Sequence, residues 1–175
     1  PAYAAGRTGQ AIDLDGTDDF VTLPRGIADY AEFTIAAWVN WDGGGNLQKV
    51  FDFGNSGSES LSLTPKSAAG TMDFTLRNRE ESYTLSTAAL TAGQWVHVAV
   101  TLAGTTARLF VNGVQMDSDT IPITPLSFAP ATNYIGKSQY ADPLFNGRVD
   151  DFVIFNQPLS AAQIGALMND KAPAF

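Results

Sequence analysis

Short apolar runs recur along the chain at intervals of roughly ten residues, and glycine, asparagine, aspartate, serine or proline separates them. Within several runs apolar and polar side chains alternate, as in QAIDLD at residues 10–15, which is typical of a strand with one face on a core. Asn112 and Gly113 form the strongest turn signal, because both tolerate the positive φ of a type I′ hairpin. With about a dozen candidate strands, the pattern predicts an all-β antiparallel sandwich or barrel, and 175 residues fit one domain spanning residues 1–175.

One segment near the end of the chain has the pattern of a helix. In LSAAQIGALMND, residues 159–170, Ser160 and Gln163 have the spacing of a capping box. Leu159 and Ile164 stand where a hydrophobic staple would place them. The segment predicts one short C-terminal helix that covers an edge of the sandwich.

Composition argues against several classes of partner and site. The formal net charge is −8, so the surface would repel phosphate backbones and anionic membranes. The sequence contains no cysteine, which rules out disulfides and thiolate zinc sites. No apolar run approaches the ~18 residues of a membrane helix. We therefore expect neither nucleic-acid binding nor membrane insertion.

Two acidic clusters lie near opposite ends of the chain: DLDGTDDF at residues 13–20, and the adjacent Asp150 and Asp151 within the apolar GRVDDFVIF. A buried, unpaired carboxylate costs several kcal/mol, and the chain has only ten lysines and arginines. Calcium takes about six to eight oxygen ligands and would solve this problem. We therefore predict a structural Ca²⁺ held by Asp15, Asp19 and Asp150, which joins the first and last strands; whether residue 150 or 151 is the ligand stays open. In the alternative, these aspartates cap turns and accept backbone N–H bonds.

Sugars bind to an aromatic side chain flanked by planar hydrogen-bonding groups, because a sugar ring has apolar faces and a rim of hydroxyls. Two loops have this composition: NWDGGGN at residues 40–46 and GKSQYADPLFNG at residues 136–147. FDFGN and LRNRE add polar side chains beside apolar runs. The candidate ligand-binding residues in these segments are Trp41, Asp52, Arg77, Gln139, Tyr140 and Asp142. For Trp41 and Tyr140 a place at the border of the core is the alternative, and for Arg77 a solvated hairpin face.

Five segments, in their order and spacing, resemble the laminin-G-like, concanavalin A-like jelly-roll modules: IDLDGTDDFVTLP, FTIAAWVNW, KVFDFGN, GQWVHVAVTLAGTTARLFVNG and YIGKSQYADPLFNGRVDDFVIFNQPLS. The resemblance covers residues 6–168 and is nearest to modules appended to bacterial secreted glycoside hydrolases, particularly arabinose-releasing ones. It implies two antiparallel sheets, a structural calcium in many members, and a role in binding sugars or proteins. Asp15, Asp19 and Asp150 match aspartates of the family's motifs.

The chain departs from the family pattern at two positions. Val153 stands where a basic residue is common, and Lys49 stands where arginine is frequent. Lys49 remains a candidate ligand contact, although an ammonium group lacks the planar fork of a guanidinium.

The sequence offers no catalytic constellation. Catalytic members of this superfold resemble glucanases with a Glu-x-Asp-x-Glu strand, and no such motif occurs here. The one histidine, His97, alternates with Trp95 and Ala99 in QWVHVAV, so we interpret it as a packed strand side chain rather than a general base. We therefore expect no catalytic residues and no enzymatic activity in this chain.

These observations lead to the hypothesis of a non-catalytic carbohydrate-binding module, secreted and extracellular, with a structural calcium ion. Its partners would be a polysaccharide or oligosaccharide of plant cell-wall type, arabinose-containing glycans among them, and a neighbouring catalytic domain of a multidomain glycoside hydrolase. The alternatives are a calcium-dependent, laminin-G-like adhesion or protein-interaction module and a small glycan-cleaving enzyme. Because one superfold hosts many functions, the resemblance alone does not decide between them.

Overall fold

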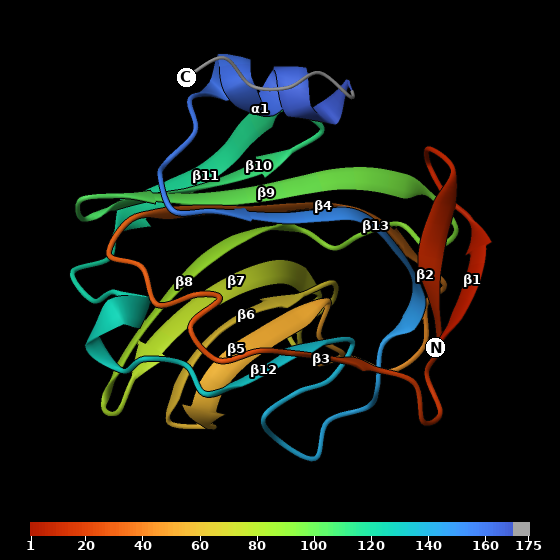
Figure 1. Cartoon of the computed structure of the whole chain (residues 1–175), viewed down its shortest axis with the longest axis horizontal. Coiled ribbons are helices and arrows are strands. Elements are labelled where there is room, and N and C mark those ends of the chain that lie inside the picture. Colours follow the sequence, from red (N-terminus) through yellow and green to blue (C-terminus); the bar gives the residue numbers. More distant parts are fainter. Residues whose placement is uncertain (170–175) are drawn as a thin grey trace.

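The computed structural model describes residues 1–169, which form two antiparallel β-sheets packed face to face and one short helix (Figure 1). The thirteen strands of this part of the chain are β1 Ala2–Ala5, β2 Gln10–Asp15, β3 Val21–Leu23, β4 Phe33–Trp41, β5 Phe51–Ser56, β6 Glu59–Thr64, β7 Thr71–Asn78, β8 Glu81–Ala88, β9 Trp95–Ala103, β10 Thr106–Val111, β11 Val114–Thr120, β12 Thr132–Ile135 and β13 Asn146–Phe155. The helical elements are the single 3₁₀ turn η1 (Pro125–Ser127) and α1 (Ala161–Met168). The predicted all-β sandwich with a short C-terminal helix is confirmed. Among the described residues, no helix has the length and apolar character needed to cross a membrane.

The strand order brings distant parts of the sequence together. One sheet has seven strands in the order β1-β2-β13-β4-β9-β10-β11, and the other has six in the order β3-β12-β5-β6-β7-β8. In the seven-stranded sheet, β13 lies between β2 and β4, with Asn146 opposite Asp15 and Val149 opposite Ile12. Strands from near the two ends of the chain are therefore neighbours, as the sequence predicts.

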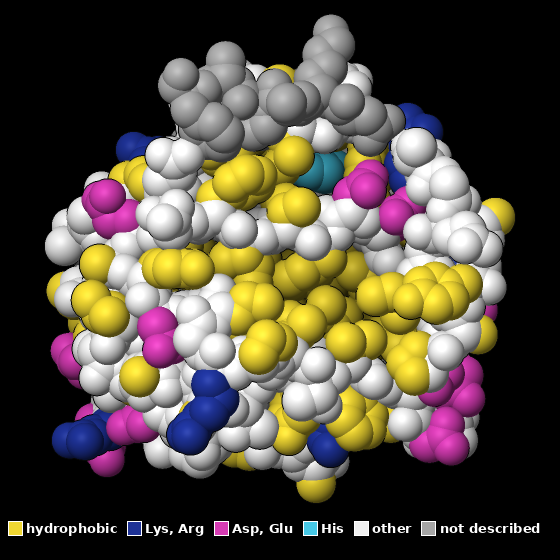
Figure 2. Space-filling model, in the orientation of Figure 1, with side chains coloured by type: hydrophobic (Ala, Val, Ile, Leu, Met, Phe, Trp, Pro, Cys, Tyr) yellow, Lys and Arg dark blue, Asp and Glu magenta, His cyan; other side chains and the backbone are white. Residues whose placement is uncertain are grey.

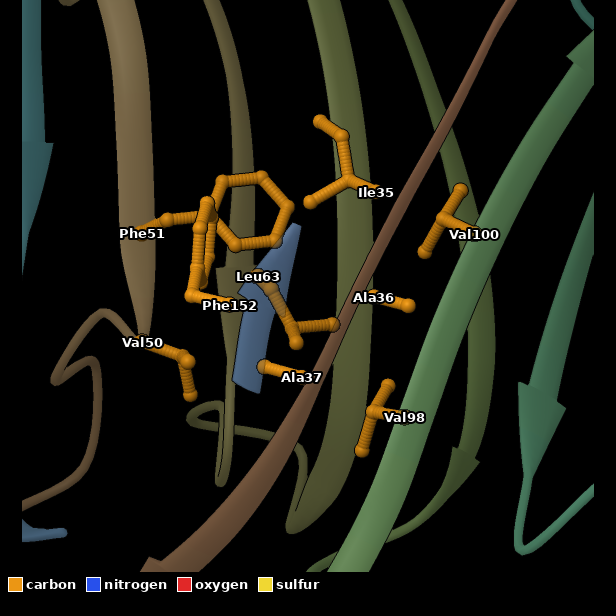
Figure 3. Close-up of a pocket in the computed structure, with 9 residues that line it drawn as sticks. All are labelled: Ile35, Ala36, Ala37, Val50, Phe51, Leu63, Val98, Val100 and Phe152. Atoms are coloured by element: carbon orange, nitrogen blue, oxygen red, sulfur yellow. The ribbon is translucent and has the colours of Figure 1, made fainter. Parts of the chain in front are cut away.

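The core lies between the two sheets, and the alternation within each strand determines which of its side chains enter the core. In β6, for example, Leu61 and Leu63 are buried in the core, and the serines between and beside them face outward. Figure 3 shows a small void in this core, whose lining includes Ile35, Phe51 and Phe152. The void measures about 10 Å³ and is apolar, so it is too small for any ligand larger than water. The site must therefore lie on an outer surface.

The sandwich is open along one side. An apolar groove of about 360 Å³ lies there, seen as the yellow hollow near the centre of Figure 2. It is lined by Ile12, Val21, Leu23, Ile27, Tyr30, Ile135, Phe152 and Ile154. These side chains belong to the core or pack against it. The groove is thus the border of the core, and it offers few groups that could hydrogen-bond to a sugar.

Helix α1 begins where the sequence predicts. Ser160 Oγ accepts a hydrogen bond from Gln163 N at 3.3 Å, and Gln163 Oε1 accepts one from Ser160 N at 2.8 Å, which completes the capping box. Leu159 and Ile164 are buried in a small cluster that includes Ala36 of the central strand β4. The helix therefore covers the outer face of the seven-stranded sheet rather than an edge of the sandwich, which corrects the predicted placement (Figure 1).

A β-bulge in β13 and the packing of its outer face together explain why this strand is apolar at both parities: Val153 and Phe155 pack against the cluster that includes Ile164 of α1. The pairing of β13 with β4 shifts between Asp150 and Val153, and Asp151 has a positive φ of 49°. Val149 belongs to the core before the bulge, and Phe152 packs against the core after it. The bulge therefore moves the core-facing side chains from odd-numbered to even-numbered positions.

Candidate functional site

A polar groove crosses the outer face of the six-stranded sheet. Its volume is about 350 Å³, which is in the range of a site for a small ligand. Strands β5, β6 and β7 form the floor, and the segments before β5 and after β12 form the walls. The groove is lined by Leu47, Lys49, Asp52, Gly57, Ser60, Ser62, Thr64, Ser67, Asp73, Thr75, Arg77, Tyr140 and Asp142.

Small hydroxyl side chains form much of the floor. Ser60, Ser62 and Thr64 alternate with buried leucines on β6, so they point away from the core. On the neighbouring β7, Thr75 lies opposite Ser62 and Arg77 lies opposite Ser60. A hydroxyl both donates and accepts hydrogen bonds, so this floor suits a ligand that is itself rich in hydroxyls.

Tyr140 stands beside the groove as an aromatic ring that is held in place. Its hydroxyl donates to the carbonyl O of Gly57 and accepts from Arg77 Nη1 at 3.0 Å. A Cβ at Gly57 would lie 2.2 Å from the tyrosine ring, so only glycine permits this contact. Tyr140 remains 50% exposed, which leaves ring surface available for stacking on a sugar.

Asp52, on β5, is a carboxylate buried at the floor of the groove. It is 1% exposed, and its Oδ2 accepts a hydrogen bond from Gln139 N at 2.9 Å. Its Oδ1 has no hydrogen-bond partner among residues 1–169. Burial raises the pKa of Asp52 from 3.8 to about 6, and the hydrogen bond from Gln139 and the charge of Lys49 oppose this shift only in part. A buried acceptor without a partner is a group that a bound ligand can satisfy.

Lys49 and Asp142 form a charged wall next to Asp52. Lys49 Nζ donates to the carbonyl O of Leu47 at 3.1 Å and lies 3.6 Å from Asp142 Oδ2. Ser138 Oγ is 2.7 Å from Asp142 Oδ2 but 3.5 Å from Asp52 Oδ2, so its single proton goes to Asp142. Protein groups therefore already balance the negative charge of Asp142, whereas the negative charge of Asp52 is balanced less completely.

The structure brings together five of the seven residues that the sequence predicts as ligand contacts. These five lining residues are Lys49, Asp52, Arg77, Tyr140 and Asp142. A sixth, Gln139, supports the floor: its Nε2 donates to the carbonyl O of Thr132 at 2.7 Å and its backbone N–H to Asp52. Their proximity is a structural result, and contact with a ligand stays a prediction for each of them.

The seventh residue, Trp41, is not available to a ligand, and its prediction as a ligand contact is wrong. It is 5% exposed and belongs to the core. Its Nε1 donates to Gln48 Oε1 at 2.8 Å, so its polar group is also satisfied inside the protein. The alternative, a place in the core, is the one that the structure shows.

Sequence reasoning missed the hydroxyl row of β6. The alternation in ESLSLT does indicate it, because period two places Ser60, Ser62 and Thr64 on the face opposite the core. What the alternation does not indicate is which loops border that face. The order β12-β5-β6-β7 decides this, since it brings the segment after β12 beside β5 and β6.

The predicted calcium site of three aspartates is wrong for Asp150. Asn146 lies opposite Asp15, so Asp150 is four residues further along β13, roughly 13 Å away. Its Oδ2 accepts hydrogen bonds from Arg7 N at 2.7 Å and Thr8 N at 3.1 Å, and its Oδ1 accepts one from the next residue's N–H at 2.9 Å. Asp150 therefore caps the turn between β1 and β2, which is the alternative that the sequence left open.

The other two predicted ligands, Asp15 and Asp19, do lie close together, with Asp18 beside them. One carboxylate oxygen from each lies within 4.8 Å of the others, and such hard oxygen donors fit a calcium ion. One of these groups has a protein partner: Thr17 N donates to Asp15 Oδ1 at 2.8 Å, which lowers the pKa of Asp15. Calcium binding by this loop stays a prediction.

Comparison with known families identifies one that matches most of the chain. A family model described as the concanavalin A-like lectin/glucanases superfamily matches residues 15–165. Among curated proteins, usherin from Rattus norvegicus is 26% identical over an alignment that covers 82% of this chain and 3% of usherin. The chain thus spans only a small part of that relative's length.

Comparison with solved structures finds similar folds. Domain 4 of AbnA, a GH43 extracellular arabinanase from Geobacillus stearothermophilus in complex with arabinotriose, is 25% identical with a TM-score of 0.88, covering 95% of this chain and 80% of that one. The CBM40 of the Ruminococcus gnavus IT-sialidase, bound to α2,3-sialyllactose, is 18% identical with a TM-score of 0.67, covering 86% and 97%. At this lower identity the second likeness shows a shared fold alone.

Proposed function

Because the chain belongs to the concanavalin A-like lectin/glucanases superfamily, we propose that it is a non-catalytic carbohydrate-binding module whose site is the polar groove of the six-stranded sheet. The observation on which this rests is the fixed, half-exposed ring of Tyr140 beside a floor of hydroxyls and one buried carboxylate. A sugar presents an apolar ring face and a rim of hydroxyls, and the groove offers a partner for each.

The shape of the groove supports an oligosaccharide as ligand. Its floor runs along β6 from Ser60 to Thr64, roughly 13 Å at the rise of an extended strand. The similar arabinanase domain is in complex with arabinotriose, which supports an arabinose-containing glycan for this chain.

A binding role is favoured over hydrolysis by the state of the carboxylates. Glycoside hydrolysis needs two carboxyl groups free to act on opposite sides of the scissile bond. Of the three carboxylates that line the groove, Asp142 is engaged by Lys49 and Ser138, and Asp73 accepts a hydrogen bond from Ser86 Oγ at 2.9 Å, which leaves Asp52 as the one with an unpartnered oxygen. We therefore propose that the groove holds a glycan without cleaving it.

The wider setting is part of the same proposal. A module of this kind would keep a catalytic domain of a secreted, multidomain glycoside hydrolase near its polysaccharide and so raise the effective concentration. A calcium ion at Asp15, Asp18 and Asp19 would steady the loop between β2 and β3. The alternative of an adhesion module is less well supported, because a hydroxyl-lined groove lacks the apolar anchors on which protein interfaces depend.

The experiment measures binding to arabinan, galactan, xylan and β-glucan by affinity gel electrophoresis and by calorimetry with their oligosaccharides. Tyr140→Ala should weaken binding by at least about tenfold, the equivalent of 1.4 kcal/mol, because it removes the stacking surface. Tyr3→Ala is the matched control, since Tyr3 is a 73% exposed tyrosine on β1, in the other sheet.

Two outcomes would count against the proposal. If none of the four polysaccharides binds, the chain lacks the proposed function for these glycans. If Tyr140→Ala binds as the parent does while circular dichroism shows an intact fold, the site lies outside this groove.

A further inference from the structure

The charges that line the groove restrict the kind of glycan it can hold. Three carboxylates, Asp52, Asp73 and Asp142, line it together with two cations, Lys49 and Arg77. The chain as a whole carries a formal charge of −8. A ligand with a carboxylate of its own would need free cationic partners at this surface.

Both cations of the groove already have protein partners. Lys49 Nζ lies 3.6 Å from Asp142 Oδ2 and donates to a backbone carbonyl, and its side chain is 10% exposed. Arg77 Nη1 donates to the hydroxyl of Tyr140 and to the carbonyl O of Gly57. An anionic ligand would therefore compete with Asp142 for Lys49, and at Arg77 it would find Nη1 engaged in holding the aromatic ring, so that only the remaining N–H groups of this guanidinium would be left to pair it.

Asp52 presents the opposite situation, an acceptor that lacks a donor. Its Oδ1 has no hydrogen-bond partner in the described part of the chain, although the residue is 1% exposed. An ionised carboxylate accepts hydrogen bonds and donates none, so a ligand hydroxyl is the natural complement. A charge-assisted hydrogen bond of this kind is about twice as strong as one between neutral groups.

We propose that the groove selects uncharged glycans and that Asp52 is the residue that determines this selection: its unpartnered Oδ1 accepts a hydroxyl of a neutral sugar, and the lining carboxylates repel a sugar that carries a carboxylate. This inference rests on the proposed sugar-binding function and adds the class of glycan to it. It separates this groove from one built for acidic sugars, to which a cationic surface would be suited.

The inference requires Asp52 to be ionised when the sugar binds. Because its pKa is raised to about 6, affinity for a neutral sugar should be about tenfold lower at pH 5 than at pH 7, as the proton competes with the ligand hydroxyl. On β6 the cross-strand neighbour of Asp52 is Ser62, which does not titrate. The charged or titratable groups on the other elements around it are Lys49, Asp73, Arg77, Tyr134, Tyr140 and Asp142.

The test is calorimetry on the intact chain with trisaccharides that differ in charge. The neutral probes are arabinotriose, xylotriose and galactotriose, and the acidic probe is trigalacturonic acid, each at pH 7 and pH 5. At least one neutral probe should bind at pH 7, and trigalacturonic acid should bind at least about tenfold more weakly. Asp52→Asn should lower affinity for the neutral probe at pH 7 and abolish its pH dependence, whereas Asp42→Asn, a change at an exposed aspartate, should alter neither.

The outcomes separate this inference from the function on which it rests. Trigalacturonic acid binding as tightly as the neutral probes would overturn the inference and leave sugar binding intact. So would an unchanged pH profile in Asp52→Asn. If no probe binds at either pH, the proposed function is contradicted for these sugars, and the inference falls with it.

Discussion

Replacing Asp52 with asparagine should stabilise the folded protein at neutral pH, although Asp52 is a proposed ligand contact. Burial raises the pKa of Asp52 from 3.8 to about 6, so between these pH values the folded state binds more protons than the unfolded state. The free energy of unfolding due to this group therefore falls as pH rises from 3.8 to 6, and stays low above pH 6. At about 1.36 kcal/mol per pKa unit, ionised Asp52 costs about 3 kcal/mol at pH 7.

The size of this effect is best measured as a difference between two pH values. At pH 3.5 Asp52 is protonated in the folded protein and resembles an asparagine in size and neutrality. Any cost of placing an unpartnered amide nitrogen at the position of Oδ1 applies at both pH values and cancels. The stability gain from Asp52→Asn should thus be about 3 kcal/mol larger at pH 7 than at pH 3.5.

The assay is urea denaturation followed by tryptophan fluorescence, at pH 3.5, 5, 6 and 7. Titration of groups that do not interact with Asp52 is common to both proteins and cancels in the difference. Asp42→Asn serves as the control, because Asp42 is exposed. A stability difference between Asp52→Asn and the parent that is the same at every pH would refute the reasoning that burial holds this carboxylate at an energetic cost.

Three further predictions concern other parts of the molecule. Burial lowers the pKa of His97 from 6.5 to about 4, so between these pH values the unfolded state binds more protons than the folded state. In the Asp52→Asn background the free energy of unfolding should therefore fall by up to about 3 kcal/mol as pH drops from 6.5 to 4. An NMR titration midpoint of the imidazole near 6.5 would contradict this. Gly57→Ala should displace the ring of Tyr140 and reduce sugar binding at least about tenfold without changing the melting temperature. Gly165→Ala is the control and should leave binding intact, because a Cβ at that position meets nothing within 4 Å. Equal binding by both variants would speak against a preorganised ring. EDTA should lower the melting temperature of the parent but not that of Asp15→Asn, and a parent melting curve unaffected by EDTA would refute the calcium site. Asp150→Ala should be destabilised with or without calcium, because it loses the acceptor of three N–H bonds.

The class of the fold could be predicted because it depends on local periodicity. Alternation such as Leu61 and Leu63 with outward serines identifies a strand and its buried face without knowledge of its neighbours. The helix start could be predicted for a similar reason, since the Ser160 and Gln163 capping box closes within four residues.

The bulge in β13 could not be predicted, because it changes the periodicity on which such reasoning depends. A strand with one inserted residue has core-facing side chains at both parities. Here the outward Val153 and Phe155 are apolar as well, because they pack against the cluster that includes Ile164 of α1, so the sequence reads as apolar on both faces. Asp150 looks like a buried carboxylate in need of a cation until the turn between β1 and β2 is placed beside it. The N–H groups of Arg7 and Thr8 that it accepts are more than 140 positions away in the sequence.

The candidate site could be predicted in part. The loop of residues 136–147 could be singled out from the sequence, because its density of polar and aromatic groups is a local property, and the structure places it at the groove; its contact with a ligand stays a prediction. The prediction for Trp41 is wrong because the burial of the last residue of β4 depends on packing partners in the core, and on Gln48 as the acceptor for its Nε1, which local patterns do not identify. Which strands form the floor of the polar groove depends on the order of strands in the sheet, and local sequence patterns do not specify that order.

The most direct test of the central claim is to locate a bound neutral sugar on the protein. An isotope-labelled chain would be titrated with the neutral oligosaccharide that binds best, and backbone amide shifts would be followed by NMR. We expect the perturbations to concentrate on β5, β6 and β7 and on Tyr140, around the groove. Perturbations confined to the apolar groove around Val21 and Phe152, or to the outer face of the seven-stranded sheet, would contradict it.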